Sequence, residues 1–174
     1  MPPRFIMLCD AFNIALVFLQ DVPGFRVGSK VERAGIIRHG AKMLYAVSEA
    51  TVPKVTVGMR KAYGAGYFVM CGRGYEPDLI VAWPTAEISV MGPEGGTTII
   101  FRKEIAAATN PDEERARRIA DFRTLIDPYV AACAALIDDV IDPRETRPTL
   151  IRALAMARTK EVERPWKKHG VMPV

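Results

Sequence analysis

Histidine is nearly absent from this chain of 174 residues, which holds only His39 and His169. The two lie far apart in sequence, and neither stands at metal-ligand spacing from a cysteine, a carboxylate or the other histidine. We therefore assign both histidines structural roles and expect no metal site.

The usual nucleophile and phosphate motifs are missing as well. Ser29 and Ser89 lack the G-x-S-x-G pattern that presents a catalytic serine. The stretch "GFRVGSK" is one residue too short for a phosphate-binding loop, and Lys30 does not directly follow Gly28. The carboxylates are scattered, so no pair of them is assigned to general acid–base chemistry.

Cysteine is limited to Cys9, Cys71 and Cys133, which form no C-x-x-C pair. The odd number argues against a disulfide framework, and we interpret all three as reduced packing residues of a cytoplasmic protein. No apolar run is long enough to span a bilayer, and Asp10 and Asn13 interrupt the run near the start. We expect neither a membrane segment nor a signal peptide.

Positive charge is modest, at a net +4, and much of it lies in the last third of the chain. No basic patch interleaved with aromatic residues is present, so we expect no nucleic-acid binding. Hydrophobic residues make up 49% of the chain, and its length suffices for one domain with a buried core.

Apolar patterning predicts strands over residues 14–19, 54–59, 78–84 and 86–92. The first is a continuous apolar run, which is typical of a strand buried on both faces of a parallel sheet. A helix between the first two strands makes a strand–helix–strand unit with a right-handed crossover.

Several helix starts are marked by capping residues. Ser29 with Glu32 forms a capping box, and one helix is predicted from there to about Ala50. Asn110, followed by proline and two acids, starts another that carries Ala116, Ile119, Phe122 and Ile126 inward. Residues 92–106 fit either a helix or a loop. Further helices are predicted over 4–12, after Gly66, after Pro128 and over 148–160, and the whole order indicates an α/β fold.

The stretch "YGAGY" places Gly64, Ala65 and Gly66 between the end of a strand and the start of a helix. The first amides of a helix have no partner within it and carry partial positive charge. Small residues let a ligand oxygen approach those amides, which then stabilise an oxygen that becomes negative during a reaction. The same turn also serves close packing alone, and the spacing does not decide between the two.

Five segments, in order and spacing, resemble the C-terminal half of the biotin-dependent acyl-CoA carboxyltransferases. They are "IIRHGAKMLYA", "ATVPKVTV", "RKAYGAGY", "AWPTAEISVMG" and the closing "ERPWKKHGVMP". That family includes the β subunits of propionyl-CoA and acetyl-CoA carboxylases and the methylmalonyl-CoA and glutaconyl-CoA decarboxylases. The resemblance extends from Arg4 to Val174.

The resemblance implies a crotonase-type α/β fold, a spiral of ββα units, with residues 1–174 as a single carboxyltransferase C-terminal domain. The family's first, CoA-binding domain is absent from this chain, and the reaction site forms where that domain meets this biotin-side domain of another subunit. Biotin is carried on a separate carrier domain, a biotin carboxylase is the further partner, and the coenzyme A thioester is the substrate. We expect a homo-oligomer that is inactive without the CoA-binding half.

The same resemblance implies the site residues. The backbone amides of Ala65 and Gly66 match the family's donors to the biotin ureido oxygen, and the ureido group itself serves as the base. The family order at this place is Gly-Gly-Ala-Tyr; amide donors do not depend on side chains, so the exchange of glycine and alanine is expected to be tolerated. Phe68 stands at the position implicated in acyl-chain selection, where a bulky aromatic argues against simple propionyl-CoA or acetyl-CoA specificity. The substrate-binding residues implied are Pro23, Gly24, Phe25, Gly64, Tyr67 and Phe68.

Other functions stay open at this stage. One alternative is a non-catalytic oligomerisation module derived from the family, for which Gly35, Gly40 and the alanines of 131–157 offer close helix contacts. A second is a decarboxylase subunit of the same family. A third is a crotonase-type enzyme that acts on CoA thioesters without biotin. The acyl group and the direction of carboxyl transfer are not indicated.

Overall fold

Five strands, all paired in parallel, form the sheet in the part of the chain that the computed structural model describes, residues 2–168 and 170–173. They are β1 Leu16–Val22, β2 Lys54–Tyr63, β3 Leu79–Ala82, β4 Glu87–Ser89 and β5 Asp139–Val140. Their order is β1-β2-β3-β5, and β4 pairs with the last residues of β2. The parallel sheet and its helical connections confirm the predicted α/β class.

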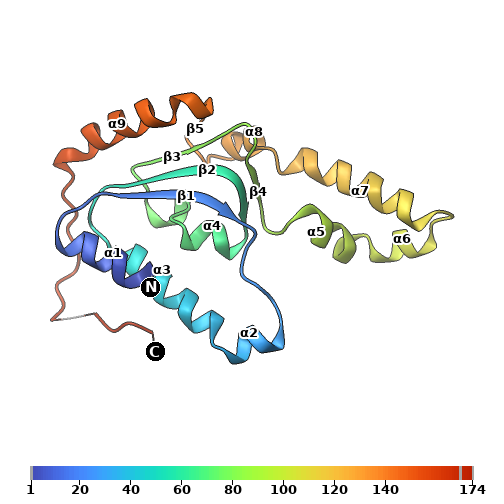
Figure 1. Ribbon diagram of the computed structural model, residues 1–174, viewed down its shortest axis with the longest axis horizontal. Helices are drawn as coiled ribbons and strands as arrows, with labels where there is room; N and C mark the ends of the chain where they lie inside the picture. The colour runs from blue at the N-terminus through green and yellow to red at the C-terminus, as the bar shows by residue number, and fades with distance from the viewer. Residues whose placement is uncertain (1, 169, 174) are drawn as a thin grey trace.

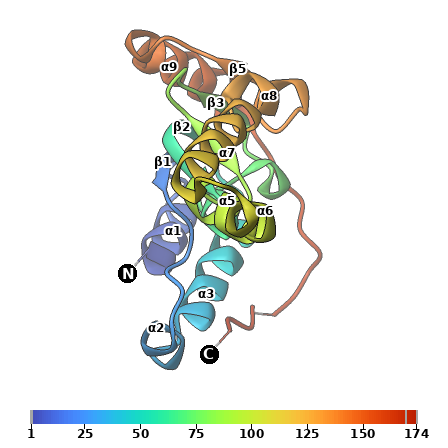
Figure 2. The ribbon, with the colours of Figure 1, turned by 90° about the vertical axis from the view of Figure 1, so that its right-hand side faces the viewer.

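Helices cover both faces of the sheet (Figure 1). The helices below the sheet are α1 Pro2–Ala11, α2 Ser29–Arg33, α3 Ile36–Glu49 and α4 Ala65–Val69, and α9 Thr146–Met156 lies above it. An arm of three helices projects from the end of the sheet: α5 Pro93–Ile100, α6 Arg102–Ala107 and α7 Pro111–Leu125. The short α8, Pro128–Cys133, leads back to β5. Figure 2 shows the same layers from the end that carries this arm.

Two apolar clusters hold these layers together. One fills the space between β1 and the helices α1 and α3, and the other lies around the end of β2 and β3. The first contains Ile6, Cys9, Leu16, Phe18, Ala46, Val47, Ala50, Val52 and Cys71, and the second contains Ala62, Tyr67, Ile80, Ala82, Ala86, Ala131 and Ile137.

The predicted helix from Ser29 to Ala50 is two helices, because Gly35 is left-handed, with φ +83°. The capping box is also wrong: Gly28 occupies the N-cap position of α2, and no side chain caps that helix. Gly40 does provide the expected close packing, although against a side chain. A Cβ at Gly40 would lie 2.3 Å from Cε2 of Phe25.

Three further expectations are corrected. β1 is not buried on both faces, because it is an edge strand whose alternate residues, Val17 and Leu19, are exposed. Asn110 caps α7 as predicted, accepting a hydrogen bond from the N–H of Glu113. However, α7 buries none of its residues fully: Ile119 and Phe122 are half-buried and Ala116 is exposed, and Ile126 just beyond the helix is buried. Cys133 is exposed, so it is not a packing residue like Cys9 and Cys71.

Candidate active site

The candidate site is the turn where β2 ends at Tyr63 and α4 begins at Ala65. Gly64 joins them with φ +53° and ψ −131°, a conformation that L-residues rarely adopt. Its N–H donates to the carbonyl oxygen of Ser89 at 2.8 Å, and a Cβ would lie 2.6 Å from the carbonyl oxygen of Val90. The strand β4 and the residue that follows it therefore restrict position 64 to glycine.

The first two amides of α4 are unused within the described residues. Tyr67 donates its N–H back to the carbonyl oxygen of Gly64 at 3.1 Å, whereas neither the N–H of Ala65 nor that of Gly66 has an acceptor there. Ala65 is exposed and Gly66 is buried. Two adjacent N–H groups with partial positive charge are what an oxygen ligand requires.

The loop that follows β1 packs on this turn. A Cβ at Gly66 would lie 2.5 Å from Cγ1 of Val22 and 3.1 Å from Cα of Gly24. The structure thus brings together the predicted residues Gly24 and Gly66, although α2, α3 and β2 lie between them in the sequence. Phe25 turns away, and its ring lies against Gly40 of α3.

Tyr67 and Phe68 follow the amides on α4 but have different surroundings. Tyr67 is buried; its hydroxyl donates to the carbonyl oxygen of Leu136 at 2.8 Å and accepts from the N–H of Arg73 at 2.9 Å. Burial raises the pKa of the Tyr67 phenol, so the hydroxyl keeps its proton. Phe68 is 46% exposed, and its ring meets that of Tyr67 edge-on at 5.2 Å. Tyr67 anchors the helix, and Phe68 is available to a ligand.

Two polar contacts that the sequence analysis did not predict hold the elements on either side of the turn. Gln20 of β1 is buried and donates from Nε2 to the carbonyl oxygens of Tyr67 at 3.1 Å and Met70 at 3.0 Å. Tyr63 donates its hydroxyl to the carboxylate of Glu87. Burial and then this hydrogen bond raise the pKa of Tyr63. The sequence signal for the first contact, which the sequence analysis did not use, is a lone glutamine at the end of an apolar run.

An exposed ion pair lies beside the same strand ends. Asp21 of β1 accepts hydrogen bonds from the N–H of Lys61 at 3.2 Å and from Nε of Arg60 at 3.3 Å. These bonds, that of the Lys61 backbone first, lower the pKa of Asp21. The pairing of β1 with β2 is irregular at this point, between Gln20 and Val22, and Asp21 bridges the irregularity.

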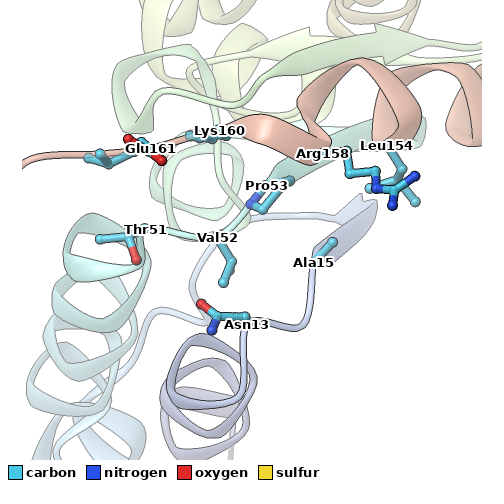
Figure 3. Close-up of a pocket in the computed structure, with 10 residues that line it drawn as sticks. Asn13, Ala15, Thr51, Val52, Pro53, Leu154, Arg158, Lys160 and Glu161 are labelled. Carbon is cyan, nitrogen blue, oxygen red and sulfur yellow. The ribbon is translucent and has the colours of Figure 1, made fainter.

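Two cavities lie away from the turn. One, of 610 Å³, opens at the N-terminal ends of β1 and β2, next to the end of α9, so it lies at the opposite end of the strands from the turn (Figure 3). Figure 3 shows Asn13, Thr51, Arg158 and Lys160 around it. The other, of 510 Å³, is lined by Phe25 together with Arg4 and His39. Neither has Ala65 or Gly66 in its wall.

In the described part of the chain, which does not include His169, no group of three histidine, cysteine or carboxylate side chains is arranged to hold a metal ion. Within the same part, no helix combines the length and the apolar character needed to cross a membrane.

The fold, with strand–helix units on a parallel sheet and a backbone turn at the end of β2, is crotonase-like, as are the carboxyltransferase structures with which it superposes. The chain belongs to the carboxyl transferase domain family, whose model matches residues 3–172. This confirms the family resemblance and the crotonase-like fold that the sequence predicts.

Three relatives show how much of such proteins the chain represents. It is 56% identical over 171 residues to the methylmalonyl-CoA carboxyltransferase 12S subunit of Propionibacterium freudenreichii subsp. shermanii, covering 98% of this chain and 33% of that protein. It is 50% identical to the methylmalonyl-CoA decarboxylase subunit alpha of Propionigenium modestum, with the same two coverages. It is 49% identical to a putative propionyl-CoA carboxylase beta chain of Bacillus subtilis, covering 98% of this chain and 34% of that protein.

Solved structures agree with these similarities. A transcarboxylase 12S crystal structure, a hexamer with methylmalonyl-coenzyme A and methylmalonic acid bound, superposes with a TM-score of 0.93 at 55% identity, covering 99% of this chain and 34% of that one. The beta subunit of Pseudomonas aeruginosa geranyl-CoA carboxylase superposes with a TM-score of 0.80 at 31% identity, covering 99% and 33%. The chain therefore spans about one third of the length of the proteins it matches.

Proposed function

We propose that this chain is the biotin-side part of an acyl-CoA carboxyltransferase, which moves a carboxyl group between carboxybiotin and an acyl-CoA. The observation that carries the proposal is the 56% identity, across 98% of the chain, to a methylmalonyl-CoA carboxyltransferase subunit. At such identity the backbone geometry of a turn is expected to be shared, and backbone amides are the only catalytic groups that the proposal requires.

The residues present fit a ureido oxygen. The N–H groups of Ala65 and Gly66 have no acceptor among the described residues, and Gly64 sets their direction through a conformation that L-residues rarely adopt. Carboxybiotin, when bound, supplies the carboxyl group. The contribution of this chain is to stabilise the ureido oxygen as it becomes negative, and a single such donor is worth about 3 kcal/mol of barrier.

The partners follow from the same proposal. The acyl-CoA is held by a CoA-binding carboxyltransferase domain, and biotin arrives on a carrier that a biotin carboxylase loads. Assembly as a homo-oligomer is supported by the hexameric transcarboxylase 12S structure. A cytoplasmic location is supported by the free thiols of Cys9 and Cys71, which are buried without a disulfide partner.

A decarboxylase is the second candidate, favoured by the 50% identity to a methylmalonyl-CoA decarboxylase subunit. The two candidates require the same chemistry from this chain. They differ in where the carboxyl group goes after it reaches biotin, which is decided by other subunits.

The test uses the full chain with a polypeptide that comprises the part of the Propionibacterium 12S subunit without a counterpart here. Decarboxylation of methylmalonyl-CoA is measured with and without free biotin. We expect no turnover from either polypeptide alone and biotin-dependent turnover from the mixture. A mixture that forms a complex but shows no biotin-dependent turnover would overturn the proposed function.

A further inference from the structure

The short strand β4 holds Gly64, the residue that directs the amides of the turn. β4 has three residues, and within the described part of the chain it pairs only with the end of β2, residues 61–63. Its last residue, Ser89, accepts the N–H of Gly64 at 2.8 Å. Because a peptide group is planar, the ψ angle of Gly64 fixes the direction of the N–H of Ala65. A movement of β4 relative to β2 would therefore redirect this N–H.

A side-chain contact fastens β4 to the same end of β2. Tyr63 donates its hydroxyl to the carboxylate of Glu87, the first residue of β4. Tyr63 is buried, and burial, followed by this hydrogen bond, raises its pKa, so the phenol keeps its proton and acts as the donor. Tyr63 pairs with Ser89 in the strand register, so its contact with Glu87 is a diagonal one between neighbouring strands. Contacts of this kind stabilise a sheet.

Tyr63 also contacts two other parts of the site. β4 leads into α5 (Figure 1), and a Cβ at Gly92, the residue before α5, would lie 3.1 Å from Cε2 of Tyr63. A Cβ at Gly24, in the loop after β1, would lie 3.5 Å from the carbonyl oxygen of Tyr63. The residue directly before Gly64 is thus enclosed by β4, by the start of α5 and by the loop that packs on the turn.

We propose that Tyr63 and Glu87 are a positioning pair for carboxyl transfer. Their hydrogen bond fixes β4 against the end of β2, and β4 in turn directs the amides of Ala65 and Gly66 toward the oxygen that they bind. The identity of that oxygen rests on the proposed function. Neither side chain is assigned a contact with substrate, so loss of the pair misdirects the two donors without removing either of them.

The first experiment measures the amide proton and nitrogen chemical shifts of Ala65 and Gly66 by nuclear magnetic resonance, in the full chain alone. We expect Tyr63→Phe, which removes the hydroxyl and keeps the ring, to move both signals. Tyr129→Phe is the matched control, because it makes the same change on an exposed residue of α8, which also contacts β4. It should leave both signals in place. Unchanged signals in Tyr63→Phe would overturn the positioning pair.

The second experiment measures kcat and KM for methylmalonyl-CoA in biotin-dependent decarboxylation by the mixture with the 12S polypeptide described above. Glu87→Ala should lower kcat about 10–100-fold and leave KM within about twofold, because the amides act on the transition state and do not hold the CoA. Glu87→Gln should keep kcat within about threefold, since its side-chain carbonyl oxygen still accepts the Tyr63 hydroxyl. Glu104→Ala, at an exposed residue of α6, is the control and should change neither constant.

A double-mutant cycle distinguishes positioning from direct contact of Glu87 with substrate. Tyr63→Phe should itself lower kcat, and it provides the comparison if Glu87→Ala does not fold. When Glu87→Ala is added to Tyr63→Phe, kcat should change by less than about threefold, because the hydrogen bond is already absent. An equal loss with and without the Tyr63 hydroxyl, or no rescue by Glu87→Gln, would overturn the positioning role.

The two experiments also separate this inference from the proposed function. Amide signals that move in Tyr63→Phe, in a chain whose mixture shows no biotin-dependent turnover, would overturn the proposed function and support the control of the amides by the pair. Turnover by the unmodified mixture, with kcat unchanged in both Glu87→Ala and Tyr63→Phe, would overturn the positioning pair and leave the proposed function in place.

Discussion

The side chain of Gln20 on β1 holds the helix α4 by donating a hydrogen bond from Nε2 to the backbone carbonyl oxygen of Tyr67 at 3.1 Å. The second hydrogen bond of the same group, to Met70, satisfies another carbonyl at the end of this short helix. Because α4 has only five residues, it has few hydrogen bonds of its own. The position of the Ala65 and Gly66 amides thus depends on a side chain from a neighbouring strand.

Replacing Gln20 by leucine should lower the free energy of unfolding by about 1–3 kcal/mol, since two buried carbonyl oxygens lose their donor. Urea denaturation of the full chain measures this. Leu19→Gln is the matched control, because the adjacent side chain points to the exposed face, and it should change stability by less than about 0.5 kcal/mol. A Gln20→Leu variant as stable as the unmodified chain would show that α4 does not need this support.

Gly64→Ala should destabilise the chain by at least about 1–3 kcal/mol, because the residue has φ +53° and its new Cβ meets the carbonyl oxygen of Val90. Gly95→Ala, in α5, is the control: a Cβ there meets nothing within 4 Å and should stabilise the helix by up to about 1 kcal/mol. Thermal unfolding of both variants gives the comparison. Similar shifts in the same direction would contradict the geometry of the turn.

Phe68→Ala should change the choice of acyl group with little effect on stability, since the ring is half-exposed next to the amide turn. Removing the ring leaves more room for an acyl chain beside the turn, which favours longer chains, and discrimination per methylene is about 1–3 kcal/mol. The ratio of kcat/KM for butyryl-CoA and propionyl-CoA, in the assembled enzyme, should rise by about tenfold or more. An unchanged ratio would remove Phe68 from the acyl site.

Lys54 gives a pH dependence with a definite sign. It is buried, with Nζ donating to the carbonyl oxygens of Tyr75 at 2.8 Å and Val47 at 3.3 Å, and burial lowers its pKa below the ordinary 10.5. At a pH between the lowered pKa of the folded chain and the ordinary 10.5, Lys54 binds a proton more often in the unfolded chain than in the folded chain. The contribution of Lys54 to the free energy of unfolding therefore rises with pH through this range. The charged or titratable groups around it are Cys71, Glu76, Lys160 and Arg164.

Urea unfolding at stepped pH, for the chain and for Lys54→Met, isolates this contribution as a difference. Cys71 contributes a pH dependence of the opposite sign, because burial raises the pKa of its thiol to about 11. Since Cys71 is present in both proteins, its contribution cancels in the difference. The slope of the free energy of unfolding against pH should be more positive in the unmodified chain than in Lys54→Met. A steeper rise in the variant would contradict the assignment.

Local signals predicted the turn at the end of β2. The β-branched run precedes the Gly-Ala-Gly sequence, and their order correctly predicted that Gly64 joins a strand to a helix. The bounds were less accurate, because β2 continues to Tyr63, beyond the predicted end at residue 59, and α4 begins at Ala65. The capping signal at Asn110 is equally local, and it correctly placed the start of α7. The family resemblance, which is confirmed, supplied the fold around these elements.

Contacts between distant residues were not predictable in the same way. The hydrogen bond from Gln20 to Tyr67 joins β1 to α4, and the sequence does not specify which carbonyl oxygen a buried glutamine contacts. The break at Gly35 depends on how α2 and α3 pack, since an interior glycine is compatible with a continuous helix. The exposure of Val17 and Leu19 depends on strand order, which an apolar run alone does not give. The roles of Ala65 and Gly66 in binding stay predictions.

The most direct test of those roles is Ala65→Pro, measured as biotin-dependent decarboxylation of methylmalonyl-CoA in the mixture with the 12S polypeptide. Ala65 is the first residue of α4, where proline fits a helix and removes only the N–H. Ala65→Gly, which keeps the N–H, is the control. We predict that the proline variant loses about 10²–10³ in kcat while the glycine variant keeps nearly all of it. Equal rates for the two variants would contradict a backbone amide at position 65 as an oxygen-binding donor.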